Sequence, residues 1–276
     1  KQYDQKAGIL YTLVAYLIWG FLPIYWKLVD YISPDQILAH RIVWSFVLMI
    51  AILLLAKKGR KFVKEFKIIM KQRKRLIGIT LASIIISLNW LTYIWAVNND
   101  HVIQASLGYY INPLISVLLG VIVLKETLNN QQRIAVLIAA LGVSILTFSY
   151  GVFPWVSLVL AITFALYGLA KKLVDVDEMF GLTIETMMVT PIALIYLFTL
   201  PEGTFSSYFN DISTLLLLMG TGAATAIPLL LFAYGARRMS LTLLGFLQYI
   251  APTIMLFIGI FLYKETFTTI HLISFV

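Results

Sequence analysis

Long apolar stretches separated by short polar segments run through the whole chain. Nine of them reach the roughly 20 residues that a helix needs to cross the hydrocarbon core of a bilayer. They are Gly8–Leu28, Pro34–Ala56, Leu76–Val97, Val102–Leu124, Arg133–Tyr150, Phe153–Leu173, Met179–Leu200, Ile212–Ala236 and Leu241–Tyr263. A tenth begins near Ile270 and is cut short where the sequence ends. The pattern predicts an all-α membrane protein with ten transmembrane helices, the last of them truncated.

Composition supports this prediction. Apolar residues make up 61% of the 276 positions and charged residues only 12%, and the mean hydropathy is +0.91. A soluble domain of this length could not bury so much apolar surface, so lipid is the expected solvent. The net charge of +8 does not indicate nucleic-acid binding, because the basic residues lie between the apolar stretches rather than together on a polar face.

The basic residues predict an orientation. All but three of the 21 Lys and Arg residues, the exceptions being Lys27, Arg41 and Lys264, fall in the N-terminal segment or in every second connection between spans. The positive-inside rule places those segments in the cytoplasm. We therefore expect a multi-pass protein of a bacterial inner membrane, with both termini in the cytoplasm.

The longest polar segment, Lys57–Arg75, has the pattern of an amphipathic helix. Phe62, Phe66, Ile69 and Met70 share one helical face, and lysines cover the rest. Such a helix is typical of a membrane surface, so anionic lipids are the expected partners of this segment.

An internal repeat relates the two halves of the chain. Moved by 139 residues, Tyr110–Pro113 (YINP) matches Tyr249–Pro252 (YIAP), and Lys125–Thr127 (KET) matches Lys264–Thr266 (KET). Each half holds five spans, an odd number, so the second copy must enter the membrane from the opposite side. We predict two inverted five-helix repeats, residues 1–150 and 151–276. A stable scaffold can also be duplicated, but inverted repeats usually support alternating access around a site in mid-membrane.

Two repeat-related prolines lie inside spans beside polar side chains. Pro113 and Pro252 each remove an amide donor and free a carbonyl four residues earlier, so helix breaks that face protein or a cavity are predicted there. A structural kink is the alternative at each proline. The polar residues beside them are candidate substrate ligands: Gln104, Tyr109, Tyr110, Asn112, Gln248 and Tyr249.

Aromatic residues away from the span ends provide further candidates. Trp19, Asn89, Trp90, Tyr93 and Tyr167 could line an amphipathic cavity for planar or apolar solutes. Large rings also fill helix interfaces, which is the alternative for each of them. Rings at the span ends, such as Trp26, are attributed to the interfacial belt.

Three ionisable side chains fall inside predicted spans away from the membrane interfaces, where an unpaired charge is costly: His40, Arg41 and Glu185. At a shift of 144 residues Arg41 aligns with Glu185. We expect Arg41 to hold an anionic group or to pair with Glu185, and Glu185 or His40 to carry a coupling proton. A structural ion pair or a snorkelling Arg41 is the alternative. Glu126 and Glu265, beside lysines at span ends, are expected to cap loops or form local salt bridges.

Signatures of enzymes and metal sites are missing from the sequence. It contains no G-x-x-x-x-G-K-[ST] phosphate loop, no H-E-x-x-H, no G-x-S-x-G motif and no cysteine. We expect no enzyme activity, no cofactor and no metal. Because the chain contains no nucleotide-binding domain, secondary transport is the simplest mechanism.

Several longer motifs resemble the RarD-type permeases of the EamA branch of the drug/metabolite transporter superfamily. They are Trp19–Phe21 (WGF), Ile37–Ser45 (ILAHRIVWS), Asn89-Trp90, Ile94–Asn99 (IWAVNN), Ala105–Pro113 (ASLGYYINP), Ile184–Thr186 (IET) and Leu244–Pro252 (LGFLQYIAP). The resemblance implies two EamA repeats, with helices 1 to 4 and 6 to 9 around a central cavity and helices 5 and 10 at the periphery. It also implies export of drugs or metabolites, since the family's naming is linked to chloramphenicol sensitivity.

The sequence thus favours a secondary transporter that exports a small organic solute, aromatic or amphipathic, by alternating access. Two alternatives stay open: uptake or exchange of a metabolite such as an amino acid, and a non-transporting membrane receptor or scaffold. The oligomeric state also stays open, with a homodimer as one option.

Overall fold

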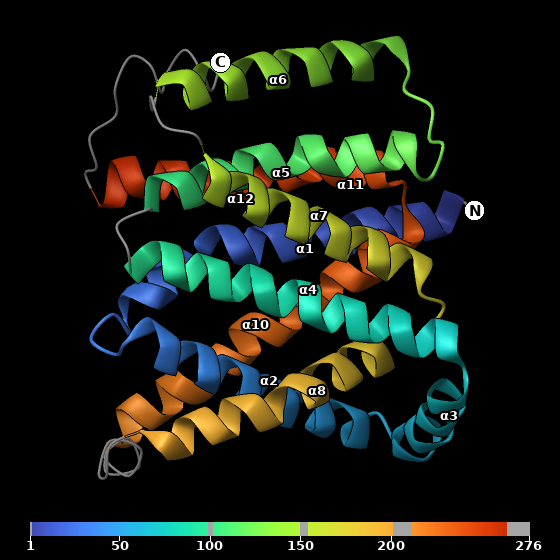
Figure 1. Cartoon of the computed structure of the whole chain (residues 1–276), viewed down its shortest axis with the longest axis vertical. Helices are drawn as coiled ribbons and strands as arrows, with labels where there is room; N and C mark the ends of the chain where they lie inside the picture. The colour runs from blue at the N-terminus through green and yellow to red at the C-terminus, as the bar shows by residue number, and fades with distance from the viewer. Residues whose placement is uncertain (1, 99–101, 150–153, 201–210, 264–276) are drawn as a thin grey trace.

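The computed structural model describes residues 2–98, 102–149, 154–200 and 211–263. Within these ranges the chain forms helices and no strands (Figure 1). The elements are α1 (Gln2–Lys27), α2 (Pro34–Leu55), α3 (Gly59–Lys71), α4 (Arg73–Asn98), α5 (Val102–Ile122), α6 (Asn130–Ser149), α7 (Trp155–Leu173), α8 (Glu178–Thr199), α10 (Ile212–Arg238), α11 (Leu241–Gln248), α12 (Ile250–Phe257) and the π-helix η1 (Ile258–Leu262).

The predicted all-α membrane fold is confirmed. In the described residues, 7 helical segments are long and apolar enough to cross a membrane, and α5 contains a shorter one, Leu107–Ile122. The nine predicted spans agree with α1, α2, α4 to α8, α10 and the run from α11 to η1. The predicted tenth span, from Ile270, lies outside the described residues.

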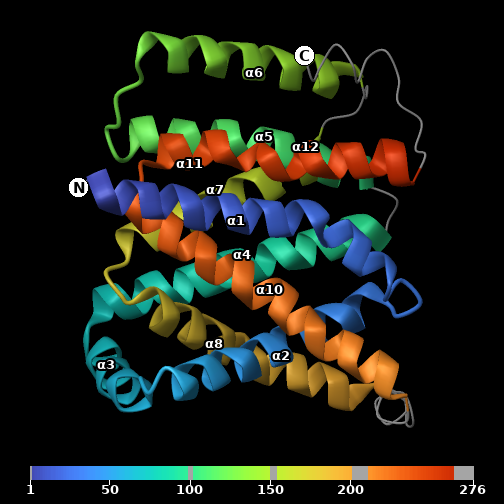
Figure 2. The same cartoon turned by 180° about the vertical axis from the view of Figure 1, so that it is seen from behind.

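The spanning helices lie side by side, so the bundle has two ends (Figures 1 and 2). We call one of them the basic end. It holds the N-terminal end of α1, the helix α3, and the connections from α5 to α6, α7 to α8 and α10 to α11, and it lies on the right in Figure 1. The opposite end holds the connection from α1 to α2.

Element bounds and packing both show the inverted repeat. The helices α2 and α8 have 22 residues each and begin 144 residues apart, and α4 and α10 begin 139 residues apart, as do α5 and α11. Helix α1 packs on α10 as α7 packs on α4, α2 packs on α10 as α8 packs on α4, and α5 packs on α7 as α12 packs on α1. Such an exchange of neighbours is what a two-fold axis in the membrane plane produces. The division at residue 150 lies outside the described residues and stays a prediction.

The amphipathic helix is confirmed as α3, but its apolar face packs mainly on protein. Ile69 is fully buried, Phe62 stacks on Phe66 at 6.0 Å, and Phe62 meets the edge of Phe180 on α8 at 5.7 Å. Met70 is half exposed, and the lysines of the other face point outward. The helix therefore packs against the bundle at its basic end, and the basic side of the helix faces away from the protein.

The two predicted helix breaks differ from each other. The prediction at Pro113 is wrong, because α5 continues through it without interruption. The second span is interrupted, but at Tyr249, three residues before Pro252. Pro252 then stands in the first turn of α12, where its missing amide proton removes no intrahelical hydrogen bond.

Candidate functional site

Arg41 lies in a cluster formed by α1, α2, α4 and α10. Its guanidinium carbon is 4.7 Å from the ring centre of Trp26 and 5.7 Å from that of Trp90, so two cation–π contacts hold it. Its Nε donates to Thr225 Oγ1 at 3.0 Å, and that hydroxyl donates to the carbonyl of Thr221 at 2.8 Å. At 1.5 Å per residue along α2, Arg41 lies roughly 10 Å inside the opposite end of the bundle.

This guanidinium has unused hydrogen-bonding capacity. No carboxylate of the described residues forms an ion pair with it, and only one of its five N–H groups has an acceptor among the described protein atoms. The predicted pairing with Glu185 is wrong, because that carboxylate binds Lys171 instead. Arg41 as a whole residue is only partly buried.

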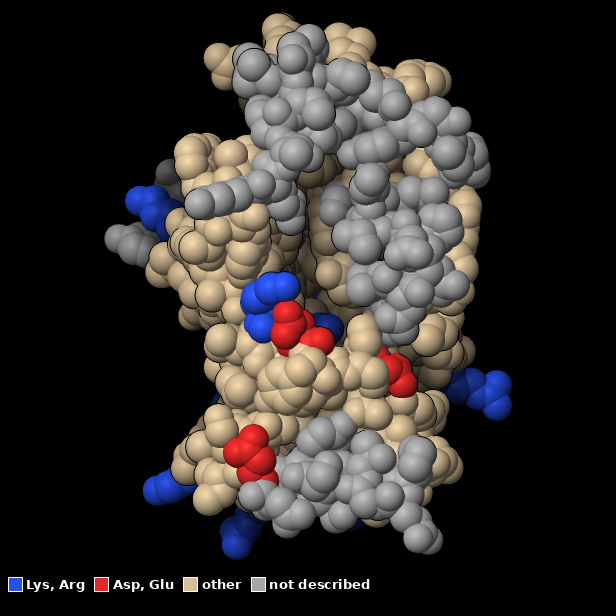
Figure 3. All heavy atoms as spheres, turned by 90° about the vertical axis from the view of Figure 1, so that its left-hand side faces the viewer, with Lys and Arg blue, Asp and Glu red and all other residues tan. Residues whose placement is uncertain are grey.

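Two tyrosines extend the cluster toward α5. Tyr93 and Tyr109 meet edge to face at 6.2 Å, and both lie within electrostatic range of Arg41. Tyr109 is 40% exposed, and Tyr93 is partly exposed. Figure 3 looks onto this end of the bundle and shows its surface hollowed in the middle. Trp90, Tyr93, Tyr109 and Arg41, which the sequence indicated as separate candidates, thus lie together in the bundle.

A layer of packed rings lies deeper in the protein. Trp19 contacts Phe164 at 5.7 Å and Phe232 at 5.8 Å, and Phe232 stacks on Tyr167 at 6.1 Å. Tyr167 and Phe232 are fully buried. Two predicted cavity residues, Trp19 and Tyr167, therefore belong to the packed core in this conformation.

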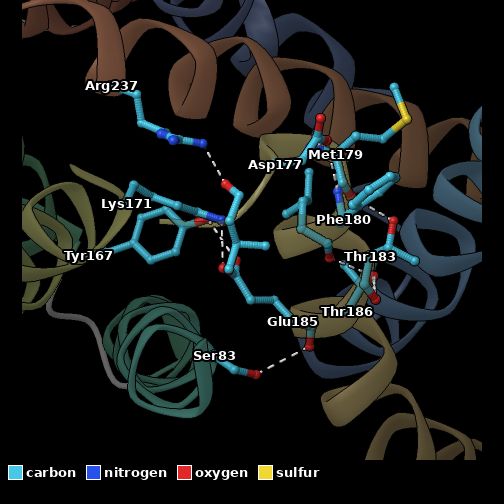
Figure 4. Close-up of polar contacts among 12 residues, drawn as sticks. Ser83, Tyr167, Lys171, Asp177, Met179, Phe180, Thr183, Glu185, Thr186 and Arg237 are labelled. Atoms are coloured by element: carbon cyan, nitrogen blue, oxygen red, sulfur yellow. Dashed lines mark hydrogen bonds and ion pairs between the residues drawn. The ribbon is translucent and has the colours of Figure 1, made fainter. Parts of the chain in front are cut away.

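Below this layer lies a buried ion pair, shown in Figure 4. Lys171 Nζ and Glu185 Oε1 are 2.5 Å apart, with side chains only 8% and 5% exposed, and the Tyr167 hydroxyl donates to Glu185 Oε2 at 3.1 Å. A cavity of about 20 Å³ beside the pair has room for roughly one water. Its lining includes Arg237 and Glu178 from the basic end.

Further ion pairs join helices at the basic end. Arg238 binds Glu178 at 2.8 Å, linking α10 to α8. Asp175, in the connection from α7 to α8, binds Arg75 of α4 at 3.2 Å and Arg237 of α10 at 3.3 Å. These contacts hold α4, α8 and α10 together and close this end of the bundle.

Glu126 also closes the basic end. Its carboxylate accepts from the backbone amides of Leu241 at 2.7 Å and Thr242 at 2.8 Å, which are the first two residues of α11. We expected Glu126 to cap a loop or to form a local salt bridge; instead it caps the start of α11, a helix of the other repeat. Glu265 lies outside the described residues.

The polar residues beside Pro113 and Pro252 come together where α5 packs against α11 and α12, but they largely bind one another. Ser116 Oγ donates to Gln248 Oε1 at 3.0 Å and lies 3.5 Å from Asn112 Oδ1. The Tyr110 hydroxyl donates to the carbonyl of Pro252 at 3.1 Å. The buried Gln248 Nε2 and the hydroxyl of Tyr249 have no hydrogen-bond partner among the described protein atoms.

Three other candidates have different positions. Asn89 Nδ2 donates to the carbonyl of Leu160 and to Thr163 Oγ1, each at 2.9 Å, so it ties α4 to α7. His40 is buried next to Arg41 in α2. The side chain of Gln104 lies outside the described residues.

Sequence reasoning missed Trp26, Thr225 and Lys171. Trp26 was attributed to the interfacial belt because it is near a span end, and Lys171 was counted only as a topology signal. A signal for both was present: Lys27–Asp30 and Lys172–Asp175 share the sequence KLVD, so Trp26 and Lys171 occupy equivalent positions of the repeat.

Comparisons with known proteins agree with this architecture. A model of the EamA-like transporter family matches residues 6–148. The chain is 48% identical to "Uncharacterized transporter YojE" of Bacillus subtilis over 99% of its own length and 91% of that protein. It is 40% identical to "Protein RarD" of Escherichia coli strain K12, over 94% of this chain and 87% of that protein. A solved structure described only as "Crystal structure of protein" has the same fold, with a TM-score of 0.72 at 18% identity, covering 98% of this chain and 93% of the other.

Proposed function

The chain belongs to the EamA-like transporter family, and we propose that it carries a small organic solute across a bacterial inner membrane by alternating access. The family and the named relatives make it a membrane transporter rather than an enzyme. The observation that carries the finer proposal is the Arg41 cluster. A cation with free hydrogen-bond donors and an aromatic surround, inside a helix bundle, is what a site for an amphipathic solute requires.

The difference between the two ends supports alternating access. With the basic end in the cytoplasm, as the positive-inside rule requires, the ion pairs of Arg238 and Asp175 and the helix cap formed by Glu126 close the cytoplasmic side. The hollow in Figure 3 then faces outward. We take this conformation as the outward-facing one. The exposed lysines of α3 would then lie against the anionic lipids of the cytoplasmic leaflet.

In this conformation we assign substrate contact to Arg41, Trp90, Tyr93 and Tyr109. The other candidates would act once the bundle rearranges: the ring layer of Trp19 and Tyr167, and the α5 to α12 contacts of Tyr110, Asn112, Gln248 and Tyr249. Movement of the two repeats, with a boundary near residue 150, would exchange the closed and open ends.

Glu185 is our preferred coupling group. It is an intramembrane carboxylate with a cationic partner, Lys171, and a water-sized cavity beside it. Protonation would neutralise Glu185 and release Lys171, which would loosen the contact between α7 and α8. His40, a buried imidazole next to Arg41 in α2, is the second candidate for the coupling proton.

Counterflow in proteoliposomes tests transport itself. Purified protein is reconstituted with an unlabelled solute inside, and uptake of the same labelled solute is measured without any ion gradient. The expected result is transient accumulation that depends on the protein. A set of solutes that binds the protein but never exchanges would contradict transport and favour a receptor.

Direction and coupling need a second experiment. Export is our preferred direction, and it predicts that an inward proton gradient accelerates release from right-side-out vesicles. Glu185→Gln should abolish this acceleration and leave counterflow measurable. If the variant still responds to the gradient, Glu185 is not the coupling group.

A further inference from the structure

The inverted repeat can be extended to the site residues. Lys27–Asp30 and Lys172–Asp175 are identical in sequence at a shift of 145 residues, and they lie where α1 and α7 end. The next helices, α2 and α8, begin 144 residues apart. The repeat therefore makes Trp26 equivalent to Lys171. It also makes Arg41 equivalent to Glu185.

The structure shows that both equivalent pairs are in contact. At the basic end, Lys171 and Glu185 form an ion pair at 2.5 Å. At the opposite end, Arg41 lies over Trp26 at 4.7 Å. The same two fold positions thus hold a lysine and a glutamate in one repeat and a tryptophan and an arginine in the other, and among the described ion pairs only the repeat with the lysine supplies a carboxylate for its cation.

In both sites a hydroxyl group also forms a hydrogen bond with a charged side chain. Glu185 accepts from the Tyr167 hydroxyl, and Arg41 donates to Thr225. The difference lies in accessibility. The ion pair is almost fully buried, whereas Arg41 is partly exposed and its terminal nitrogens have no acceptor among the described protein atoms.

We propose that the transported solute is an organic carboxylate with an apolar or aromatic body, and that its carboxylate binds the terminal nitrogens of Arg41. The substrate carboxylate would thereby neutralise Arg41, as Lys171 and Glu185 neutralise each other in the other repeat. A planar guanidinium binds a carboxylate through two parallel hydrogen bonds, and the cation–π contacts with Trp26 and Trp90 use no N–H donor of Arg41. Tyr93 and Tyr109 would pack against the body of the solute. This inference rests on the proposed transport function.

Intrinsic tryptophan fluorescence can test the inference, because Trp26 and Trp90 flank the proposed anion position. The whole chain is placed in nanodiscs of zwitterionic lipid and titrated with phenylacetate, with its neutral analogue phenylacetamide and with the cation phenethylamine. We expect phenylacetate to bind roughly 10- to 100-fold more tightly than the amide, the range for a charge-assisted hydrogen-bond pair. Equal affinities of acid and amide would overturn the proposal.

Variants separate Arg41 from general electrostatics. Arg41→Gln should remove the preference for the acid over the amide, and Arg41→Lys should keep a reduced preference because a point charge replaces the bidentate fork. Lys27→Gln is the matched control, since it removes an exposed positive charge near the same end of the bundle and should leave the preference unchanged. A preference that survives Arg41→Gln, or disappears equally in Lys27→Gln, would overturn the assignment. Thermal melting of each variant verifies that it is folded.

Two further arms distinguish the remaining outcomes. If nanodiscs with phosphatidylglycerol abolish phenylacetate binding and Arg41→Gln abolishes this competition, the site holds a lipid headgroup and the proposal is overturned. Counterflow of labelled phenylacetate addresses the function separately. Binding without exchange would refute transport but leave the carboxylate site, whereas exchange of neutral or cationic solutes alone would refute the carboxylate and leave transport.

Discussion

The buried ion pair of Lys171 and Glu185 makes a quantitative prediction about stability. The two side chains are 8% and 5% exposed, and the closest atoms are 2.5 Å apart. Removal of one partner leaves the other charge in a medium that solvates it poorly, which typically costs about 3–5 kcal/mol. Glu185→Gln should lie near the lower limit, because the amide oxygen can still accept from the Tyr167 hydroxyl. Lys171→Met should lie higher, because the carboxylate keeps only that hydroxyl.

The double variant Lys171→Met/Glu185→Gln leaves no charge at the site. We expect it to cost only about 1–2 kcal/mol, so that the coupling energy of the cycle, the two single costs minus the double cost, is about 5–7 kcal/mol. The free energy of unfolding is measured by titration from dodecyl maltoside into sodium dodecyl sulfate, with far-ultraviolet circular dichroism as the readout.

A matched control comes from the exposed pair of Lys27 and Asp30, whose side chains are 65% and 53% exposed. Its cycle should show no coupling beyond experimental error, because water and salt screen such pairs. If the effects of Lys171→Met and Glu185→Gln are additive, the two charges do not stabilise each other and the close contact has no energetic role.

Three further predictions concern helix ends and helix packing. Glu126→Ala should destabilise the protein by about 1–2 kcal/mol through loss of the α11 cap, and Glu126→Gln by less, in the same titration. Gly222→Ala should cost about 1–3 kcal/mol and slow counterflow, because the added methyl would lie 2.4 Å from a backbone carbon of α2, whereas at Gly59 the nearest atom is 3.7 Å away and alanine should be tolerated. Hydrogen bonds from the start of α10 lower the pKa of Asp211, so its contribution to stability is present above its unfolded pKa and is lost as the pH falls through the lowered folded value. The melting temperatures of wild type and Asp211→Ala should therefore approach each other as the pH falls through the lowered pKa, and a gap that stays constant from neutral pH into strong acid would contradict this.

Much of the fold could be predicted because its causes are local. The thickness of the bilayer core sets the length of each apolar stretch. The pattern of apolar residues therefore predicted the span Pro34–Ala56, which agrees with α2, Pro34–Leu55, to within one residue. The positions of the helix breaks are the exception, because the ninth span is interrupted at Tyr249 and α5 continues through Pro113. A proline inside a span is compatible with a continuous helix when neighbouring groups satisfy the freed carbonyl, so Pro113 and Pro252 could not be told apart from their own sequences.

The candidate site was predicted less well, because it depends on contacts between helices. Arg41 was identified as a candidate site residue because a charged side chain inside a membrane is energetically costly. Its contacts with Trp26 and Thr225 were not predicted. The predicted partner Glu185 is equivalent to Arg41 in the repeat, and equivalence under an inverted repeat places two residues near opposite ends of the bundle rather than together. Their alignment was informative, but it indicated corresponding positions and not a contact.

By itself, then, the sequence determined the number and length of the spans, the expected orientation and the presence of two related halves. Each of these follows from hydrophobicity, charge or self-similarity along the chain. The tertiary structure alone decided that Lys171 neutralises Glu185, that Glu126 caps a helix of the other repeat, and that Arg41 keeps free donors between two tryptophans. A transmembrane helix is apolar on nearly every side, so its sequence does not say which face meets which neighbour, and the chemistry of this site depends on those faces.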